Sequence, residues 1–211
     1  MRRQVSEKGR KPPSMHDFRA FIAISLSPEI QHGLGQTIDS LKHLMPGAPV
    51  RWVKPQNIHL TIKFLGNVPL SNQEVLTRSM ASETGRHPAF ELSVGGLGVF
   101  STIRRPKVVW VGVQAPDELT ALYKGIESEM ARLGFTPEPR PFSPHLTLGR
   151  VSHQAGSGDY EVIARAIKQS KVGFLGALRV CSLELFRSDL KPEGPVYSRL
   201  FSAPLMDQAA S

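Results

Sequence analysis

Two spacings of apolar residues alternate along the chain. From residue 28 to 46, and again from 119 to 133, apolar side chains recur every three or four positions, which is the spacing of an amphipathic α-helix. Shorter apolar runs, some alternating with polar residues, separate these segments and are typical of β-strands. Pro46-Gly47 and Gly134 mark helix ends. The pattern therefore predicts a mixture of helices and strands rather than an all-helical or all-strand chain.

The predicted elements follow a regular order. Strands are predicted at 18–26, 50–53, 58–65, 90–100, 107–113, 146–151, 177–186 and 196–201, and helices at 27–45, 71–84, 119–133 and 160–170. Ser71 and Glu74 have the spacing of a capping box at the start of the second helix. The elements divide into two halves of similar content, so we expect an α+β fold with two mainly antiparallel sheets side by side and helices on their outer faces.

One short pattern occurs in both halves. Residues 59–62 read His-Leu-Thr-Ile and residues 145–148 read His-Leu-Thr-Leu, 86 positions apart, and each histidine has a proline four residues before it. In a strand, residues two apart lie on the same face, roughly 6.6 Å from each other. Each strand would therefore bury its two aliphatic side chains and present a histidine and a threonine hydroxyl to a cleft. Duplication of a half-chain is a hypothesis that this pair suggests.

Two imidazoles and two hydroxyls around one pocket suit acid–base chemistry on an anion. The pKa of an unperturbed imidazole, about 6.5, lies close to neutral pH, so one histidine can act as base while the other acts as acid. Hydrolysis of a phosphodiester needs both roles, and hydroxyls can donate to the non-bridging oxygens where charge develops. The remaining histidines are expected to be solvated: His16, His32, His43, His87 and His153.

Two cations follow the motifs. Strict alternation places Lys63 on the strand face of His59 but points Arg150 away from His145, unless the strand ends or twists at Gly149. Both cations are equally consistent with ordinary surface charge. A metal centre is disfavoured because neither motif has a nearby Asp, Glu or Cys, and no Ser or Cys nucleophile motif occurs. We expect no metal and no cofactor.

The composition and charge of the chain indicate its kind of partner and its compartment. The sequence has 211 residues and a formal net charge of +8, of which residues 1–14 carry +4 through five cations and one anion. A mildly basic body favours an anionic partner such as RNA or a nucleotide. Cys181, the single cysteine, excludes an intrachain disulfide and is expected to be buried and inert. Neither a membrane-spanning run nor a secretory signal is expected, which favours the cytoplasm.

We expect three regions along the chain. Residues 1–16 form a disordered basic tail, residues 17–204 a single two-lobed domain, and residues 205–211 a frayed C-terminal tail.

The motifs and their flanks resemble the 2H phosphoesterase superfamily, and within it the RNA 2′,3′-cyclic phosphodiesterases, also called 2′-5′ RNA ligase-like proteins. The resemblance extends over about residues 18–201. It is carried by the segments 21–24, 51–66, 106–112, 141–150 and 183–188.

The resemblance implies a bilobal fold with pseudo-twofold symmetry and a central cleft lined by both motifs. It implies hydrolysis of an RNA 2′,3′-cyclic phosphate to a 2′-phosphomonoester. His59 would donate a proton to the leaving 3′-oxygen and His145 would activate water. Thr61 and Thr147 would hold the phosphate, and Arg150 would contact the nucleotide.

Other functions remain open. The same cleft could serve a non-catalytic module that binds RNA ends or nucleotides, although binding alone does not need two titrating groups. ATP-independent 2′-5′ RNA ligation is expected as a side reaction, because water competes for the cyclic phosphate. Other cyclic phosphates are possible substrates. We expect a monomer.

Overall fold

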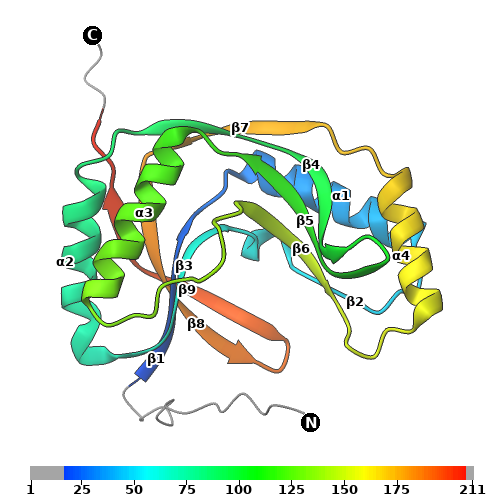
Figure 1. The fold of residues 1–211 in the computed structure, drawn as a ribbon, viewed down its shortest axis with the longest axis horizontal. Helices are drawn as coiled ribbons and strands as arrows, with labels where there is room; N and C mark the ends of the chain where they lie inside the picture. The colour runs from blue at the N-terminus through cyan, green and yellow to red at the C-terminus, as the bar shows by residue number, and fades with distance from the viewer. Residues whose placement is uncertain (1–16, 208–211) are drawn as a thin grey trace.

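Two antiparallel sheets form the body of the protein, whose computed structural model describes residues 17–207 (Figure 1). Sheet A has the strand order β3-β1-β8-β9, and sheet B has the order β2-β6-β5-β4-β7. Sheet A consists of β1 (Asp17–Ile24), β3 (Leu60–Pro69), β8 (Ser182–Lys191) and β9 (Gly194–Pro204). Sheet B consists of β2 (Val50–Trp52), β4 (Phe90–Thr102), β5 (Arg105–Gln114), β6 (His145–Val151) and β7 (Phe174–Val180). The expected α+β class with two antiparallel sheets is confirmed.

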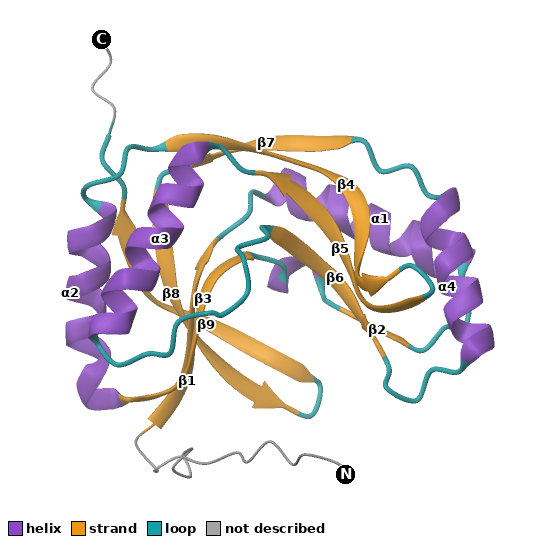
Figure 2. Cartoon of the chain, in the orientation of Figure 1, coloured by secondary structure: helices purple, strands orange, loops and turns teal. Residues whose placement is uncertain are grey.

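Four helices cover the outer faces of the sheets: α1 (Pro28–Leu44), α2 (Gln73–Thr84), α3 (Asp117–Arg132) and α4 (Ser157–Gln169). Helices α2 and α3 pack on sheet A, whereas α1 and α4 pack on sheet B (Figure 2). We call sheet A with α2 and α3 lobe A, and sheet B with α1 and α4 lobe B. Two short 3₁₀ turns, η1 (Pro55–Asn57) and η2 (Leu70–Asn72), precede β3 and α2.

Each half of the chain contributes a helix to the opposite lobe. Helix α1 follows β1 of sheet A yet covers sheet B, and α3 follows β5 of sheet B yet covers sheet A. The amphipathic pattern explains the burial of each helix: in α3, Leu119, Leu122 and Ile126 are fully buried on one face. This reciprocal exchange fits the expected pseudo-twofold relation between the halves, and it ties the two lobes together.

The helix boundaries follow local capping chemistry in part. The Ser27 hydroxyl accepts the amide of Ile30 at 3.4 Å, and Pro28 occupies the first turn of α1, as the sequence predicts. The predicted capping box at Ser71 and Glu74 is wrong. Helix α2 begins at Gln73 after η2, with no side-chain cap, so Ser71 lies in the 3₁₀ turn instead of at the helix N-cap.

The predicted strand 177–186 is two strands that belong to different sheets. Strand β7 ends at Val180 in sheet B, and β8 begins at Ser182 in sheet A. Cys181 lies at this junction and is exposed, so the prediction of a buried thiol is wrong. An apolar run that is continuous in sequence changes sheets here, and the residue between the strands faces outwards.

The chain end is more ordered than expected as far as it is described. Leu205 is buried, and its amide donates to the carbonyl of Cys181 at 2.8 Å. Met206 forms an isolated bridge with Pro88. The prediction that the chain frays from residue 205 onwards is therefore wrong for residues 205 and 206. The predicted tails at 1–16 and 208–211 lie outside the described residues.

His87 also differs from its prediction as a solvated residue. Its Nε2 lies 2.8 Å from a carboxylate oxygen of Glu83, and both side chains are largely buried. The pair joins the end of α2 to the segment that leads into β4. Among the described residues, no helix has the length and apolarity that crossing a membrane requires.

Candidate active site

The two motif strands lie at the inner side of the two lobes, where β3 and β6 approach each other (Figure 1). The aliphatic residues of both motifs are buried, as predicted: Leu60 and Ile62 in sheet A, Leu146 and Leu148 in sheet B. Thr61 and Thr147 alternate with them and are half-buried. The histidine–threonine faces are therefore directed away from the two cores.

His59 lies in an aromatic enclosure on sheet A. Its ring stacks on Phe21 with 4.5 Å between ring centroids and meets the edge of Tyr197 at 5.3 Å. Phe186 stacks on Phe21 at 5.3 Å and also lies 6.3 Å from His59 between ring centroids. Burial lowers the pKa of His59 from 6.5 to about 4, because the apolar surroundings disfavour the charged imidazolium. A pKa of about 4 favours the neutral form of His59 near pH 7.

His145 has a more open environment on sheet B. Its ring makes an edge contact with Phe100, with 4.6 Å between centroids. Burial lowers the pKa of His145, and the positive charge of Arg150 lowers it further, against the opposing effect of a hydrogen bond to Ser143. Both histidines thus favour the neutral form, but His59 has the stronger apolar contacts and His145 has a cation beside it.

Both imidazoles are held by the same backbone contact. Nδ1 of His59 lies 2.9 Å from the carbonyl oxygen of Asn57, and Nδ1 of His145 lies 2.8 Å from the carbonyl oxygen of Ser143. A carbonyl only accepts, so each Nδ1 carries the hydrogen. Within residues 17–207 neither Nε2 has a hydrogen-bond partner, which leaves Nε2 of each ring for a substrate.

A β-bulge follows each histidine at the same position. In sheet A, Ile22 pairs with Lys63 and Ala23 with Thr61, so Ile62 is an extra residue on β3. In sheet B, Val109 pairs with Gly149 and Trp110 with Thr147, so Leu148 is the extra residue on β6. A bulge interrupts strict alternation and turns the following residues to the opposite faces.

The bulge on β3 corrects the prediction for Lys63. The side chain of Lys63 points to the core rather than to the face of His59, and the residue is only 4% exposed. Phe64 takes the cleft face instead, where it is 63% exposed and lies 6.2 Å from Phe21 between ring centroids. Lys63 is therefore not part of the histidine face.

Lys63 instead connects three segments. Its Nζ donates to Oε2 of Glu127 on α3 at 2.8 Å and to the carbonyl of Thr136 at 2.8 Å. Oε2 of Glu127 also accepts the amide of Glu138 at 3.3 Å. Thr136 and Glu138 belong to the segment between α3 and β6, which leads to His145. Lys63 thus supports the segment that precedes the second motif.

The bulge on β6 brings Arg150 to the face of His145. The sequence predicts this placement only if the strand departs from alternation at Gly149, and the bulge provides that departure. Gly149 takes the core-facing position, where an added Cβ would lie 2.7 Å from Val50 and 2.9 Å from Trp52. Arg150 is exposed and pairs in register with Arg51. Its charge acts on both His145 and Tyr197.

Tyr197 links the two lobes electrostatically. Burial raises its pKa, and the cations Arg150 and Arg19 oppose that effect. Tyr197 contacts His59 in lobe A, and it also feels the charge of Arg150, which follows His145 in lobe B. The two motifs therefore face one cleft. The histidine motifs do not identify Phe21, Phe186 and Tyr197 as residues of the site. Their role comes from register between strands that are distant in the chain, which no local pattern reports.

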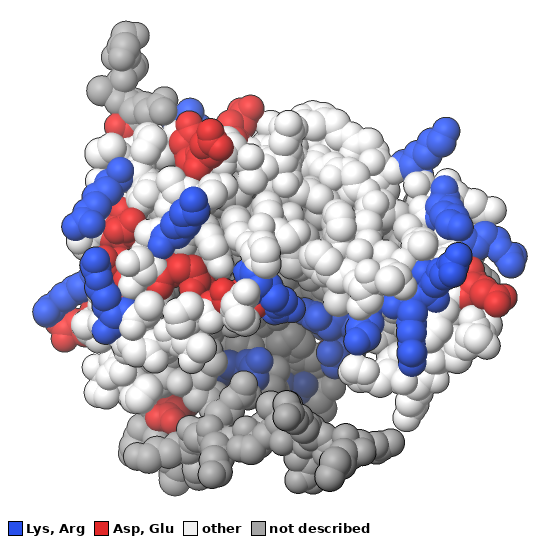
Figure 3. Space-filling view, viewed as in Figure 1, with Lys and Arg blue, Asp and Glu red and all other residues white. Residues whose placement is uncertain are grey.

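Charge is distributed unevenly over the surface. On the face in Figure 3, Lys and Arg side chains gather around α4 and along the recess between the lobes, and others lie over α2 and α3. Most Asp and Glu side chains on that face lie over α2 and α3. Within the described range, no group of three His, Cys, Asp or Glu side chains has the arrangement of a metal site. The donors around the histidines are hydroxyls and arginines.

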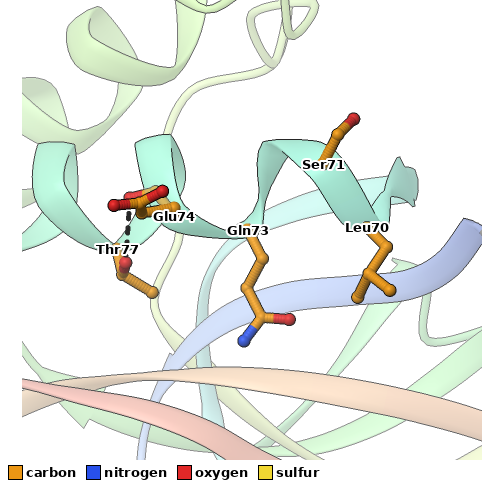
Figure 4. Close-up of a pocket in the computed structure, with 5 residues that line it drawn as sticks. All are labelled: Leu70, Ser71, Gln73, Glu74 and Thr77. Carbon is orange, nitrogen blue, oxygen red and sulfur yellow. Dashed lines mark hydrogen bonds between the residues drawn. The ribbon is translucent and has the colours of Figure 1, made fainter.

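A separate surface pocket lies outside this cleft. It is lined by Leu70, Ser71, Gln73, Glu74 and Thr77 at the start of α2 (Figure 4). The hydroxyl of Thr77 donates to the carbonyl of Glu74 at 2.9 Å, so that group is satisfied within the helix. The pocket has no histidine and one carboxylate, which does not suit an anionic substrate.

The family described as LigT like Phosphoesterase matches the chain twice, over residues 24–110 and 111–197. The chain belongs to this family. Each match contains one histidine motif, so the same family model describes both halves of this chain. The match thereby supports the duplication that the motif pair suggests.

Relatives agree over most of the chain. An RNA 2′,3′-cyclic phosphodiesterase of Methanothermobacter thermautotrophicus is 34% identical over 180 residues, 85% of this chain and 95% of the relative. One from Archaeoglobus fulgidus is 34% identical over 184 residues, 86% of this chain and 97% of the relative.

Solved structures share the fold. The protein TT0787 of Thermus thermophilus aligns with a TM-score of 0.74 and 25% identity, over 90% of this chain and 100% of that one. Escherichia coli LigT complexed with 3′-AMP aligns with a TM-score of 0.69 and 27% identity, over 90% of this chain and 98% of that one.

Proposed function

We propose that the protein hydrolyses 2′,3′-cyclic phosphates at RNA ends or on nucleosides and releases a 2′-phosphomonoester. The observation that carries the proposal is the matched pair of imidazoles, each with Nδ1 fixed on a backbone carbonyl and Nε2 left for the substrate. The names of the relatives, RNA 2′,3′-cyclic phosphodiesterases, agree with this substrate. A phosphodiester between the two Nε2 atoms would meet one base and one acid.

In the proposed reaction His145 is the base and His59 the acid. Nε2 of His145 takes a proton from water as the water oxygen attacks phosphorus. The bond between phosphorus and the 3′-oxygen breaks, and that oxygen takes a proton from Nε2 of His59. The 2′-phosphomonoester leaves with His145 protonated and His59 neutral, and exchange with solvent restores the starting state. This order follows the family resemblance.

The lowered pKa of His59 sets a condition on this mechanism. With a pKa of about 4, His59 is neutral in the empty cleft near pH 7. A bound phosphodiester anion raises the pKa of a neighbouring imidazole, since an opposite charge favours the protonated form. The substrate itself would therefore supply the charge that holds the acid proton on His59.

The phosphate would be held by groups from both lobes. The hydroxyls of Thr61 and Thr147 would donate to the non-bridging oxygens, and the guanidinium of Arg150 would offset their charge. These donors stabilise the developing charge without a metal ion, so we propose metal-independent hydrolysis. ATP-independent 2′-5′ ligation would be a side reaction of the same site. A cytoplasmic location and a monomeric state stay predictions from the sequence.

The test is an assay with product identification. Purified protein is incubated with a nucleoside 2′,3′-cyclic phosphate in EDTA, and the product is assigned by ³¹P NMR. We expect turnover in EDTA and a 2′-phosphate product. A 3′-phosphate product or a strict metal requirement would overturn the mechanism, and binding without turnover would favour the non-catalytic module.

A further inference from the structure

A second polar pocket lies at the far end of sheet B. It has a volume of about 450 Å³ and lies where the β4–β5 hairpin meets the end of β6 and helix α4. The hairpin contributes Ser101, Thr102, Arg105 and Lys107, and the segment after β6 contributes Ser152 and His153. Its lining thus combines hydroxyls with cationic or cation-capable groups and contains no carboxylate. That composition suits an anion.

Two of the hydroxyls have a free hydrogen to donate. Oγ1 of Thr102 accepts the amide of Arg105 at 3.2 Å, and Oγ of Ser152 accepts the amide of Gln154 at 3.2 Å. Each hydroxyl accepts from the backbone, so its own hydrogen is available for a ligand. Ser101 has a φ of +79°, a left-handed conformation that costs free energy in a non-glycine residue and is often retained at binding sites.

The cations of the pocket are not neutralised by the protein. Within residues 17–207, neither Arg105 nor Lys107 forms an ion pair with a carboxylate. Most ion pairs in this range lie on or beside α1, α2 and α3, away from the pocket. The guanidinium of Arg105 lies 5.7 Å from the centre of the Tyr160 ring, which orients it. Of the two acids that flank Tyr160 on α4, Asp159 accepts the amide of Gly156 at 2.8 Å, and neither Asp159 nor Glu161 forms an ion pair with Arg105 or Lys107 within the described residues.

The pocket and the active site lie along one strand. β6 begins at His145 and ends at Val151, which is followed by the pocket residues Ser152 and His153. Ser152 lies seven positions after His145 along extended chain, roughly 20 Å away. A ligand group in the pocket would therefore belong to the same molecule as the cyclic phosphate only if that molecule is longer than one nucleotide.

We propose that this pocket binds a backbone phosphate of an RNA strand whose cyclic end lies between His59 and His145. Because a 2′,3′-cyclic phosphate closes the 3′ end, the strand can leave the cleft only on its 5′ side. Arg51 and Arg150, paired side by side on β2 and β6, would follow the strand from the cleft toward Lys107 and Arg105. The inference rests on the proposed function and adds a second binding site that only an oligoribonucleotide substrate can reach.

The test compares one short and one long substrate. kcat and KM are measured for a mononucleoside 2′,3′-cyclic phosphate and for a ten-residue RNA ending in the same group. For the double variant Arg105→Gln/Lys107→Gln, we expect KM for the RNA to rise about 10-fold, with KM for the mononucleotide unchanged. The salt dependence of RNA binding should weaken by roughly 0.7 in log–log slope for each lost phosphate contact. Arg78→Gln/Arg132→Gln, on α2 and α3, is the matched control and should change neither substrate.

A binding measurement separates this inference from the proposed chemistry. Fluorescence anisotropy with a ten-residue RNA that ends in an ordinary 2′,3′-diol needs no hydrolysis. We expect the Arg105→Gln/Lys107→Gln variant to bind this RNA more weakly by a similar factor, and Arg105→Lys/Lys107→Arg to bind normally. Unchanged RNA affinity, or an equal loss on the mononucleotide, would overturn the second site while leaving the two-histidine mechanism in place.

Discussion

The two motif strands share one irregularity and use it differently. Each has a bulge three residues after its histidine, which turns the fourth residue to the core and the fifth to the cleft. On β3 these residues are Lys63 and Phe64, and on β6 they are Gly149 and Arg150. Lobe A therefore has the aromatic ring of Phe64 on the face of its histidine, and lobe B has the cation Arg150 there. A repeated backbone has thus produced two chemically different halves of one site.

This difference suits two roles for two identical side chains. In the proposed mechanism, the aromatic enclosure of His59 would make its protonation depend on a bound anion, whereas the open setting of His145 would give water access to its ring. Substitutions can test this difference between the lobes, from the two imidazoles to the groups that support them.

The largest effect is expected from removing either imidazole. His59→Ala and His145→Ala should each lower kcat by about 10²- to 10⁴-fold, because each removes one of the two proton transfers. His32→Ala, on α1, is the matched control and should leave kcat unchanged. If either active-site variant retained turnover close to wild type, the two-histidine assignment would be wrong.

Lys63 tests the support on the core side of the bulge. Lys63→Met leaves the largely buried Glu127 carboxylate without its cation and should lower the free energy of unfolding by roughly 3–5 kcal/mol in urea titrations. Lys42→Met removes an exposed pair with Asp39 and should cost about 1 kcal/mol or less.

A double variant checks that the buried charge is the cause. Lys63→Met/Glu127→Leu should recover much of the lost stability, since no uncompensated charge then remains. A Lys63→Met protein as stable as Lys42→Met would show that Lys63 does not hold these segments.

The enclosure of His59 predicts a pH dependence of stability. The pKa is about 6.5 in the unfolded chain and about 4 in the folded protein, so between these values the unfolded state binds the extra proton. The contribution of His59 to the free energy of unfolding is therefore complete above pH 6.5, and it is lost as the pH falls toward 4. The loss amounts to about 3 kcal/mol relative to a His59→Gln variant, measured by urea unfolding at several pH values.

His145→Gln provides the comparison for this measurement. Its ring has fewer aromatic contacts, so we expect a shallower difference of the same sign. Equal pH slopes for wild type and His59→Gln would contradict the enclosure of His59.

The smallest effects are expected at the hydroxyls. Thr61→Val and Thr147→Val keep the shape of the side chain and remove one donor each, so kcat/KM should fall by about 10-fold. Thermal unfolding should be almost unchanged, because both residues lie on the cleft side of their strands. A large loss of stability would show that the hydroxyls serve the fold instead.

Much of the fold could be predicted because its signals are local. Helical spacing, capping by Ser27 and the alternation in both motifs identify the elements within a few residues, and the buried face of each motif strand is correct. The assignment of β7 and β8 to different sheets could not be predicted, since pairing partners lie far away in sequence.

The sequence identifies the residues that we propose to react but not their surroundings. The histidines and threonines follow from a repeated pattern, whereas Lys63 and Arg150 were assigned to faces by alternation. A bulge adds a residue to one strand of a pair, and the neighbouring strands β1 and β5 carry no local signal of that extra residue. For the same reason Phe21 and Tyr197 emerge only from strand register.

A sulfur-substituted substrate tests most directly whether His59 and His145 have opposite proton-transfer roles. Replacing the 3′-bridging oxygen of the cyclic phosphate with sulfur gives a thiolate leaving group, which needs no proton because a thiol is far more acidic than an alcohol. We predict that His59→Ala regains most of the wild-type rate on this substrate and that His145→Ala regains none. Rescue of His145→Ala instead, or of neither variant, would contradict the assignment.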